Sequence, residues 1–153
     1  PSHWKHRELL YNDDYPVLLV HPDHPLSKRR EISLAEVKDE PFVALTPGFS
    51  SRKYFDDLCE RTGFTPKIAI ECDYMMRSYM VMKKIGVALA TAYTNYARLY
   101  DGTCCIDITE PVFPRVQALF RDEKRHMNAA AARFQKFATN FYPGHSCRKT
   151  PPL

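Results

Sequence analysis

The stretch Leu45-Thr46-Pro47-Gly48-Phe49-Ser50-Ser51-Arg52 joins a short apolar run at residues 42–45 to a strongly periodic segment at residues 53–61. The apolar run predicts a strand, the Pro-Gly pair predicts a turn, and the periodic segment predicts a helix that begins near Ser51. The chain around this stretch is therefore expected to have an α/β fold.

The predicted helix start has the features of an anion receptor. Ser50 and Ser51 are favourable N-cap residues, and Asp56 and Asp57 are close enough to the start to favour its positive end. Backbone N–H groups at a helix start, next to a glycine such as Gly48, can receive a small anion. A strand-turn-helix also occurs throughout α/β proteins, so the turn alone does not define a site.

Strand and helix patterns alternate along the first two thirds of the chain. Strands are predicted at residues 15–20, 42–45, 67–72 and 87–90, and helices at residues 34–38, 51–62, 75–84 and 93–99. This order argues for a parallel sheet. The remaining segments are a leading stretch without periodicity at 1–15, strands at 103–108 and 115–120, a helix at 128–142 and a frayed tail at 143–153.

The composition is that of an ordinary soluble globular protein. The 153 residues are 44% hydrophobic and 26% charged, which is enough for one core or two small lobes. No apolar run approaches the length of a membrane span, and the first residues do not resemble a signal peptide. We therefore expect no membrane partner.

The charge and the cysteines point to a cytoplasmic protein that does not bind nucleic acid through a basic surface. The net charge is +4, and residues 121–153 hold seven Lys/Arg against two Asp/Glu, a local excess of +5 that suits a solvated helix face. The five cysteines are Cys59, Cys72, Cys104, Cys105 and Cys147. Their odd number and irregular spacing favour reduced thiols over a disulfide framework.

Several motifs occur together in a recognisable order. They are the strand Val17-Leu18-Leu19-Val20 followed by His21-Pro22-Asp23-His24-Pro25-Leu26-Ser27, then Leu34-Ala35-Glu36-Val37, the turn at residues 46–52, Gly63-Phe64-Thr65-Pro66 and a closing Ala130-Ala131-Ala132-Arg133-Phe134. Over residues 15–142 this order resembles the effector-binding domain of LysR-type transcriptional regulators.

The resemblance implies a periplasmic-binding-protein-like (type II) fold, with two α/β lobes that hold a small effector between them. It divides the chain into a leading segment with the first crossing strand (1–25), the second lobe (26–112), the returning strand and helix of the first lobe (113–142) and a flexible tail (143–153). The family's winged helix-turn-helix and most of its first lobe have no counterpart here, so the chain resembles a fragment. DNA binding would reside in a missing N-terminal domain.

The resemblance also implies an effector site at the carboxyl ends of strands, where open α/β sheets bind ligands. Its residues would be Thr46, Pro47, Gly48, Phe49, Ser50, Ser51, Tyr74, Met75, Met76 and Thr91. Hydroxyls and helix N–H groups suit a carboxylate or other small anion, and the Phe, Tyr and Met side chains suit an aromatic or aliphatic body. Plain packing of the Met and Tyr side chains is the alternative. After the strand Gly86-Val87-Ala88-Leu89, the family usually has Leu-Pro, and this sequence has Ala90-Thr91 instead.

Other chemistries have less support. Peroxide-sensing members of the family carry a reactive cysteine in the turn and a second one nine residues later, and here these positions are Ser50 and Cys59. Cys59 is therefore expected to be a packed thiol. The pairs His3/His6 and His21/His24 lack the further ligands of a metal site. No nucleophile elbow, phosphate-binding glycine loop or His-Glu-x-x-His motif is present, so no enzyme, metal or cofactor is predicted.

The leading hypothesis is a small-molecule-sensing domain of a LysR-type regulator, acting as a homo-oligomer. Because most of the first lobe is missing, weak effector affinity is expected. A stand-alone solute-binding module of a transport system and an enzyme on the same scaffold are the alternatives.

Overall fold

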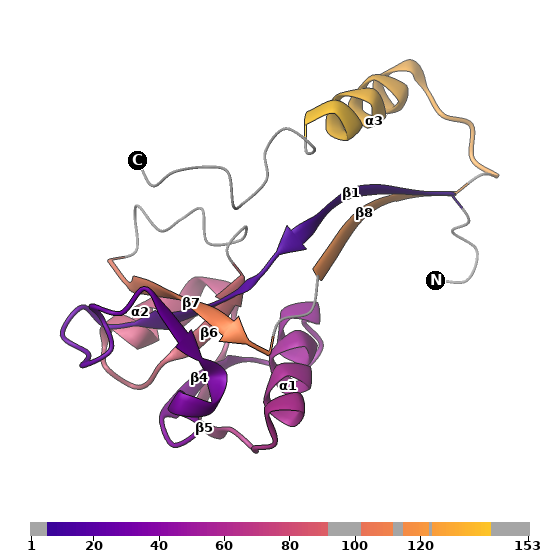
Figure 1. Cartoon of the computed structure of the whole chain (residues 1–153). Helices are drawn as coiled ribbons and strands as arrows, with labels where there is room; N and C mark the ends of the chain where they lie inside the picture. Colours follow the sequence, from indigo (N-terminus) through magenta and orange to yellow (C-terminus); the bar gives the residue numbers. More distant parts are fainter. Residues whose placement is uncertain (1–5, 92–101, 112–114, 123, 142–153) are drawn as a thin grey trace. The chain divides into compact units, whose positions relative to one another are not determined.

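The computed structural model describes residues 6–91, 102–111, 115–122 and 124–141. It contains two compact units (Figure 1). The larger unit comprises Tyr15–Phe113, and the smaller unit comprises Pro1–Asp14 together with Pro114–Leu153. The predicted helix at 93–99 and the predicted tail at 143–153 lie outside the described residues.

The larger unit alternates strands and helices, as predicted. Its elements are β2 (Pro16–Val20), β3 (Glu31–Ser33), the 3-10 helix η1 (Leu34–Val37), β4 (Pro41–Leu45), α1 (Ser50–Thr62), β5 (Lys67–Cys72), α2 (Tyr74–Met82), β6 (Ala88–Thr91) and β7 (Cys104–Glu110). The predicted helix at 34–38 is thus a single 3-10 turn. The sequence Ser33-Leu34-Ala35-Glu36 has the spacing of a capping box, and the backbone N–H of Ser33 donates to Glu36 Oε1 at 3.0 Å.

The strands of the larger unit follow one order, β3-β7-β2-β6-β4-β5. Hydrogen-bonded ladders form β3-β7-β2-β6 and β4-β5, and a parallel bridge between Phe42 and Val87 links β4 to the start of β6. At this bridge Val43 N–H donates to Val87 O at 2.8 Å and Val87 N–H donates to Pro41 O at 2.9 Å. The two ladders are therefore connected through backbone hydrogen bonds.

The sheet is mixed, so the prediction of a parallel sheet is wrong for β2. This strand runs antiparallel to both of its neighbours, β6 and β7, whereas β3–β7 and β4–β5 are parallel pairs. The helices α1 and α2 are crossover connections that make β4, β5 and β6 parallel. The proline-containing segment 21–30 after β2 is not helical, so it imposes no such parallel return.

Side chains of β2 enter two apolar cores, one on each face of the sheet. Leu18 and Val20 pack with residues of η1, β4 and α1, while Val17 and Leu19 pack with residues of β6 and α2. All five residues of β2 are buried, as its continuous apolar run predicted. Cys104 and Cys105 contact opposite cores, as the alternation of a strand requires.

Three local predictions need correction. The N-cap of α1 is Phe49, which makes no side-chain cap hydrogen bond, rather than Ser50 or Ser51. The helix therefore begins one residue earlier than predicted and ends, as predicted, at Gly63 in the left-handed conformation (φ 83°). The alternation of Ile68, Ile70 and Cys72 with Lys67, Ala69 and Glu71 predicts a half-buried strand, but most of β5 is exposed, Ile68 included. β5 is the last strand in the order, so one long side of its backbone has no strand neighbour in the described sheet.

The smaller unit contains a strand that the sequence did not predict. β1 (His6–Asp14) pairs antiparallel with β8 (Arg115–Arg121), and the register shifts twice along the ladder. α3 (Ala129–Phe141) follows as predicted. The helical spacing of Ala131, Phe134, Ala138 and Phe141 predicts an apolar stripe, but of these four residues Ala138 is buried and the others are exposed. The irregular ladder explains why residues 1–15 showed no clean alternation of side chains.

Candidate functional site

The carboxyl ends of β4, β5 and β6 point to the same edge of the sheet. Leu45 at the end of β4 pairs with Cys72 at the end of β5, and the parallel bridge between Phe42 and Val87 orients β6 in the same direction. Beyond the last pair, Thr46 N–H donates to Cys72 O at 3.0 Å. The predicted site residues after β4 and β5 are thus anchored to one edge.

The start of α1 and the start of α2 meet at this edge. The hydroxyl of Tyr74 donates to Ser51 Oγ at 2.6 Å, and the rings of Phe49 and Tyr74 lie edge to face with centroids 5.0 Å apart. Both rings are partly exposed. The structure therefore brings Tyr74 into contact with Phe49 and Ser51, which lie more than twenty residues before it in the sequence.

The other predicted site residues differ in their exposure to solvent. Met75 is 86% exposed, Met76 is also exposed, and Thr91 is buried at the end of β6. Pro47 and Gly48 form an exposed turn in which Gly48 has a φ of 105°, a conformation that favours glycine. Met75 thus presents an apolar side chain to solvent, whereas Thr91 is part of the packed interior at the end of β6.

The two helix starts differ in electrostatics. The N-cap of α1 supplies no side-chain acceptor, whereas Asp73 caps α2 by accepting a hydrogen bond from Met76 N–H at 3.0 Å. The Asp73 carboxylate stabilises the positive end of α2 and disfavours a second anion there. An anion at this edge is therefore better placed at the start of α1.

Sequence reasoning missed a buried arginine below Tyr74. Arg77 is 5% exposed, its guanidinium lies 5.6 Å from the centroid of the Tyr74 ring, and its Nη1 donates to Leu89 O at 3.4 Å. The sequence did contain a signal for this burial. Arg77 is the one charged residue of α2, and it lies three residues after Tyr74 and four before the buried Val81, so all three share one face of the helix. Arg77 connects the aromatic side chain at this edge to β6.

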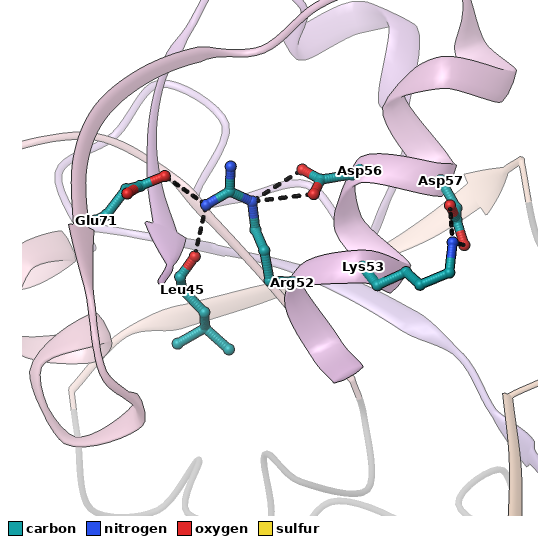
Figure 2. A network of polar contacts seen from close by, with 6 residues as sticks. All are labelled: Leu45, Arg52, Lys53, Asp56, Asp57 and Glu71. Atoms are coloured by element: carbon teal, nitrogen blue, oxygen red, sulfur yellow. Dashed lines mark hydrogen bonds and ion pairs between the residues drawn. The ribbon is translucent and has the colours of Figure 1, made fainter. Parts of the chain in front are cut away.

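A second arginine holds the first turn of α1 against the strand ends (Figure 2). Arg52 Nη1 donates to Leu45 O at 2.8 Å and to Glu71 Oε1 at 2.5 Å, and Arg52 Nε donates to Asp56 Oδ1 at 2.9 Å. Burial alone would lower the pKa of Arg52, but the hydrogen bonds to Glu71 and Asp56 outweigh it and raise the pKa. Asp56 and Asp57 pair with Arg52 and Lys53 and lie beyond the first turn of α1, so the prediction that they favour its positive end is wrong.

This network yields a prediction about stability. Replacing Arg52 by methionine keeps the apolar stem and removes the guanidinium, and we expect a loss of about 2 kcal/mol in the free energy of unfolding. The side chain of Arg52 is 13% exposed, so Leu45 O would lose a partly buried donor. Urea denaturation followed by circular dichroism measures the change.

The matched control is Lys53→Met in the next position of α1. Lys53 makes an ion pair with Asp57, but its side chain is 77% exposed, and such pairs contribute little. We expect no measurable change for this variant. Equal losses for both variants would contradict the anchoring role of Arg52.

The redox alternative is not supported by the environment of Cys59. Cys59 lies on the buried face of α1, and burial, with a smaller contribution from Asp56, raises the pKa of its thiol to about 12. A thiol of this kind is protonated at neutral pH and is a poor nucleophile. Ser50 is the first residue of α1, so a hydroxyl and not a thiol stands at the start of this helix.

Cys59 is expected to resist alkylation in the folded protein. Because its pKa is about 12, raising the pH from 7 to 9 should still leave it protonated and unlabelled. Iodoacetamide labelling followed by peptide mass spectrometry should modify Cys59 only after unfolding, while the partly buried Cys104 serves as an internal comparison. Rapid labelling of Cys59 in the native protein would restore a redox hypothesis.

Two further findings concern the described residues as a whole. They contain no group of three or more His, Cys, Asp and Glu side chains arranged to hold a metal ion. Within the same ranges, none of the helices has the length and apolar character needed to cross a membrane.

Most of this chain is similar in sequence to known transcriptional regulators. The chain is 27% identical over 125 residues to the transcriptional dual regulator GltC of Bacillus subtilis (strain 168), an alignment that covers 81% of this chain and 42% of GltC. The chain thus spans about two fifths of the length of the curated relatives that it matches.

Solved structures share the fold. The regulatory domain of Synechocystis PCC6803 CcmR in complex with 2-PG matches with a TM-score of 0.79 at 15% identity, covering 93% of this chain and 69% of that chain. The effector-binding domain of QuiR in complex with shikimate matches with a TM-score of 0.74 at 21% identity, covering 91% and 66%. These likenesses show the periplasmic-binding-protein-like type II fold.

The family itself is shown by a direct match. The family model of the LysR substrate binding domain matches residues 2–142, a range that includes the whole larger unit, most of the smaller unit and every residue of the edge described above. This chain belongs to the LysR substrate-binding domain family.

Proposed function

We propose that this chain is the effector-sensing part of a LysR-type transcriptional regulator, and that the edge formed by the starts of α1 and α2 binds a small anionic effector. The observation that carries the proposal is the convergence of Phe49, Ser51 and Tyr74 where β4, β5 and β6 end. Ligands of open α/β sheets bind at such carboxyl ends.

The proposed site comprises the residues that the sequence analysis named. They are Thr46, Pro47, Gly48, Phe49, Ser50, Ser51, Tyr74, Met75, Met76 and Thr91. The start of α1, which lacks a side-chain cap, would receive a carboxylate. The exposed rings and methionines would contact an apolar body.

The likeness to QuiR supports a carboxylate as the class of effector. QuiR is bound to shikimate, which carries a carboxylate, and its domain shares the fold of this chain. Effector binding acts on a regulator only if two arrangements of the protein bind it with different affinity, so we propose such a difference here. The relative GltC is more than twice as long as the segment that matches this chain. We therefore propose that DNA binding and oligomer contacts belong to a whole cytoplasmic regulator. We assign no catalysis to this edge.

The experiment is a titration of the 153-residue chain with small carboxylates, including shikimate, followed by NMR so that weak binding is detected. Ser51→Ala and Tyr74→Phe each remove one partner of the 2.6 Å hydrogen bond. For the tightest carboxylate we expect each to weaken binding about five- to tenfold, because an ordered hydroxyl at the edge is lost.

Tyr79→Phe is the matched control, since Tyr79 is an exposed tyrosine on the same helix, where Lys83 Nζ lies 5.2 Å from its ring centroid. Its affinity should equal that of the original chain. Unchanged affinity in Ser51→Ala and Tyr74→Phe, or an equal loss in Tyr79→Phe, would refute the proposed site.

A further inference from the structure

A pocket opens at the opposite end of the same strands from the proposed effector site at the starts of α1 and α2 (the effector edge). It has a volume of about 260 Å³ and lies where β2 ends and where β4 and β6 begin. Its lining residues are His21, Asp23, His24, Pro25, Glu40, Pro41, Lys84, Gly86 and Val87. β4 has five residues, so the pocket and the effector edge are separated by roughly 15 Å along the strands.

Backbone contacts hold the wall of this pocket in place. Val87 N–H donates to Pro41 O at 2.9 Å, and Gly86 lies so close that an added Cβ would be 2.3 Å from Pro41 O. The turn before Gly86 contains Lys84 with a φ of 59°, a conformation that is uncommon for residues other than glycine. The side chain of Lys84 nevertheless reaches across to Asp23, with Nζ and Oδ2 2.9 Å apart.

In both histidines of the pocket, Nδ1 accepts a backbone hydrogen bond, which leaves Nε2 as the hydrogen-bond donor. Nδ1 of His21 accepts from Asp23 N–H at 2.9 Å, and Nδ1 of His24 accepts from Leu26 N–H at 3.2 Å. An imidazole whose Nδ1 accepts a hydrogen bond carries its proton on Nε2 when neutral. Nε2 of His24 lies 3.7 Å from Glu40 Oε2, which is too long for a direct hydrogen bond.

The pocket therefore combines two kinds of polar group. The ammonium of Lys84 and the imidazole N–H groups are donors, and the carboxylates of Glu40 and Asp23 are acceptors. Pro25, Pro41 and Val87 add apolar surface. The volume lies just below the range of drug-sized ligands, so an occupant is small.

We propose that this pocket is a second ligand site, which binds a small zwitterion of the α-amino acid class. The ligand's carboxylate accepts hydrogen bonds from Lys84 and the imidazole N–H groups, and its ammonium donates to Glu40. A simple anion would be placed beside the carboxylates of Asp23 and Glu40, and a simple cation beside Lys84, so a molecule with both charges matches the lining better than either. A metal ion is disfavoured because Nε2 carries the proton in the tautomer that the Nδ1 contacts select.

The test is an NMR titration of the 153-residue chain with glycine, L-alanine and L-glutamine, observing the imidazole resonances of His21 and His24. Acetate, methylammonium and glycerol serve as probes for the anion, the cation and the uncharged polyol. We expect at least one amino acid to bind saturably and to shift both imidazoles, and we expect the three fragments to bind at least about tenfold more weakly.

Two variants test the assigned contacts. Glu40→Gln removes the acceptor charge, and Lys84→Asn removes the ammonium with a residue that tolerates a positive φ. Each should weaken amino-acid binding about tenfold, while Glu60→Gln, at an exposed position of α1, should not. Circular dichroism checks that the variants are folded.

The outcomes separate this site from the effector edge. Tyr74→Phe should leave amino-acid binding unchanged, and Glu40→Gln should leave carboxylate binding at the edge unchanged. Absence of saturable amino-acid binding, equal affinity for acetate, methylammonium or glycerol, or unchanged affinity in Glu40→Gln and Lys84→Asn would each overturn the proposal, whatever the result at the effector edge.

Discussion

Replacing Gly86 by alanine is expected to lower the free energy of unfolding of the larger unit by about 3 kcal/mol. A Cβ at this position would lie 2.3 Å from Pro41 O and 2.8 Å from Pro41 C, both of them backbone atoms that cannot rotate away. Relief of the clash requires β4 and the start of β6 to move apart. That movement would strain the hydrogen bond from Val87 N–H to Pro41 O, which helps to connect the two ladders.

Urea denaturation of Gly86→Ala measures this loss, with Gly63→Ala as the matched control. Gly63 has a φ of 83° and open space around the added Cβ, so its substitution costs only the left-handed conformation, about 1 kcal/mol. The difference between the two variants isolates the steric contact. Equal losses would mean that β4 and β6 do not approach as closely as the structure shows.

Phe42→Ala is expected to have the larger effect, about 4 kcal/mol. Phe42 is fully buried in β4, and its ring lies 5.3 Å from that of Phe55 and 6.3 Å from that of Phe64, measured between centroids. Truncation removes apolar contacts and leaves a cavity between β4 and α1. Because Phe42 also forms the bridge to Val87, packing around it supports the junction of the ladders.

The comparison variant is Phe137→Ala on α3. Phe137 is exposed and stacks on Phe141 with centroids 5.3 Å apart, so its removal should cost no more than about 1 kcal/mol. Thermal and urea denaturation of both variants would test the ranking. A loss for Phe42→Ala as small as that for Phe137→Ala would contradict the core assignment.

Local patterns predicted most elements of the larger unit because their signals lie within a few residues. The continuous apolar run of β2, the periodicity of α1 and the glycine at position 63 each identify an element without knowledge of its neighbours. β1 escaped prediction because its partner β8 lies about a hundred residues away and their register is irregular. The direction of β2 likewise depends on long-range pairing with β6 and β7.

The candidate site was predictable to a similar degree. The family resemblance implied a site at the turn after β4 and the start of α2, and both lie at carboxyl ends of strands, where open α/β sheets bind ligands. The hydrogen bond between Tyr74 and Ser51 and the position of Arg77 depend on which strands are adjacent, and this order cannot be read from local patterns. The cap of α1 at Phe49 overrode the usual serine preference, since both serines fall inside the helix.

Chemical-shift mapping of the backbone amides with the tightest-binding carboxylate tests the central claim most directly. We expect the largest shifts at residues 46–51 and 74–76, and we expect no response at residues 21–25 and 84–87 around the amino-acid pocket. Largest shifts at the amino-acid pocket or on α3, with residues 46–51 unaffected, would contradict the assignment of the effector edge.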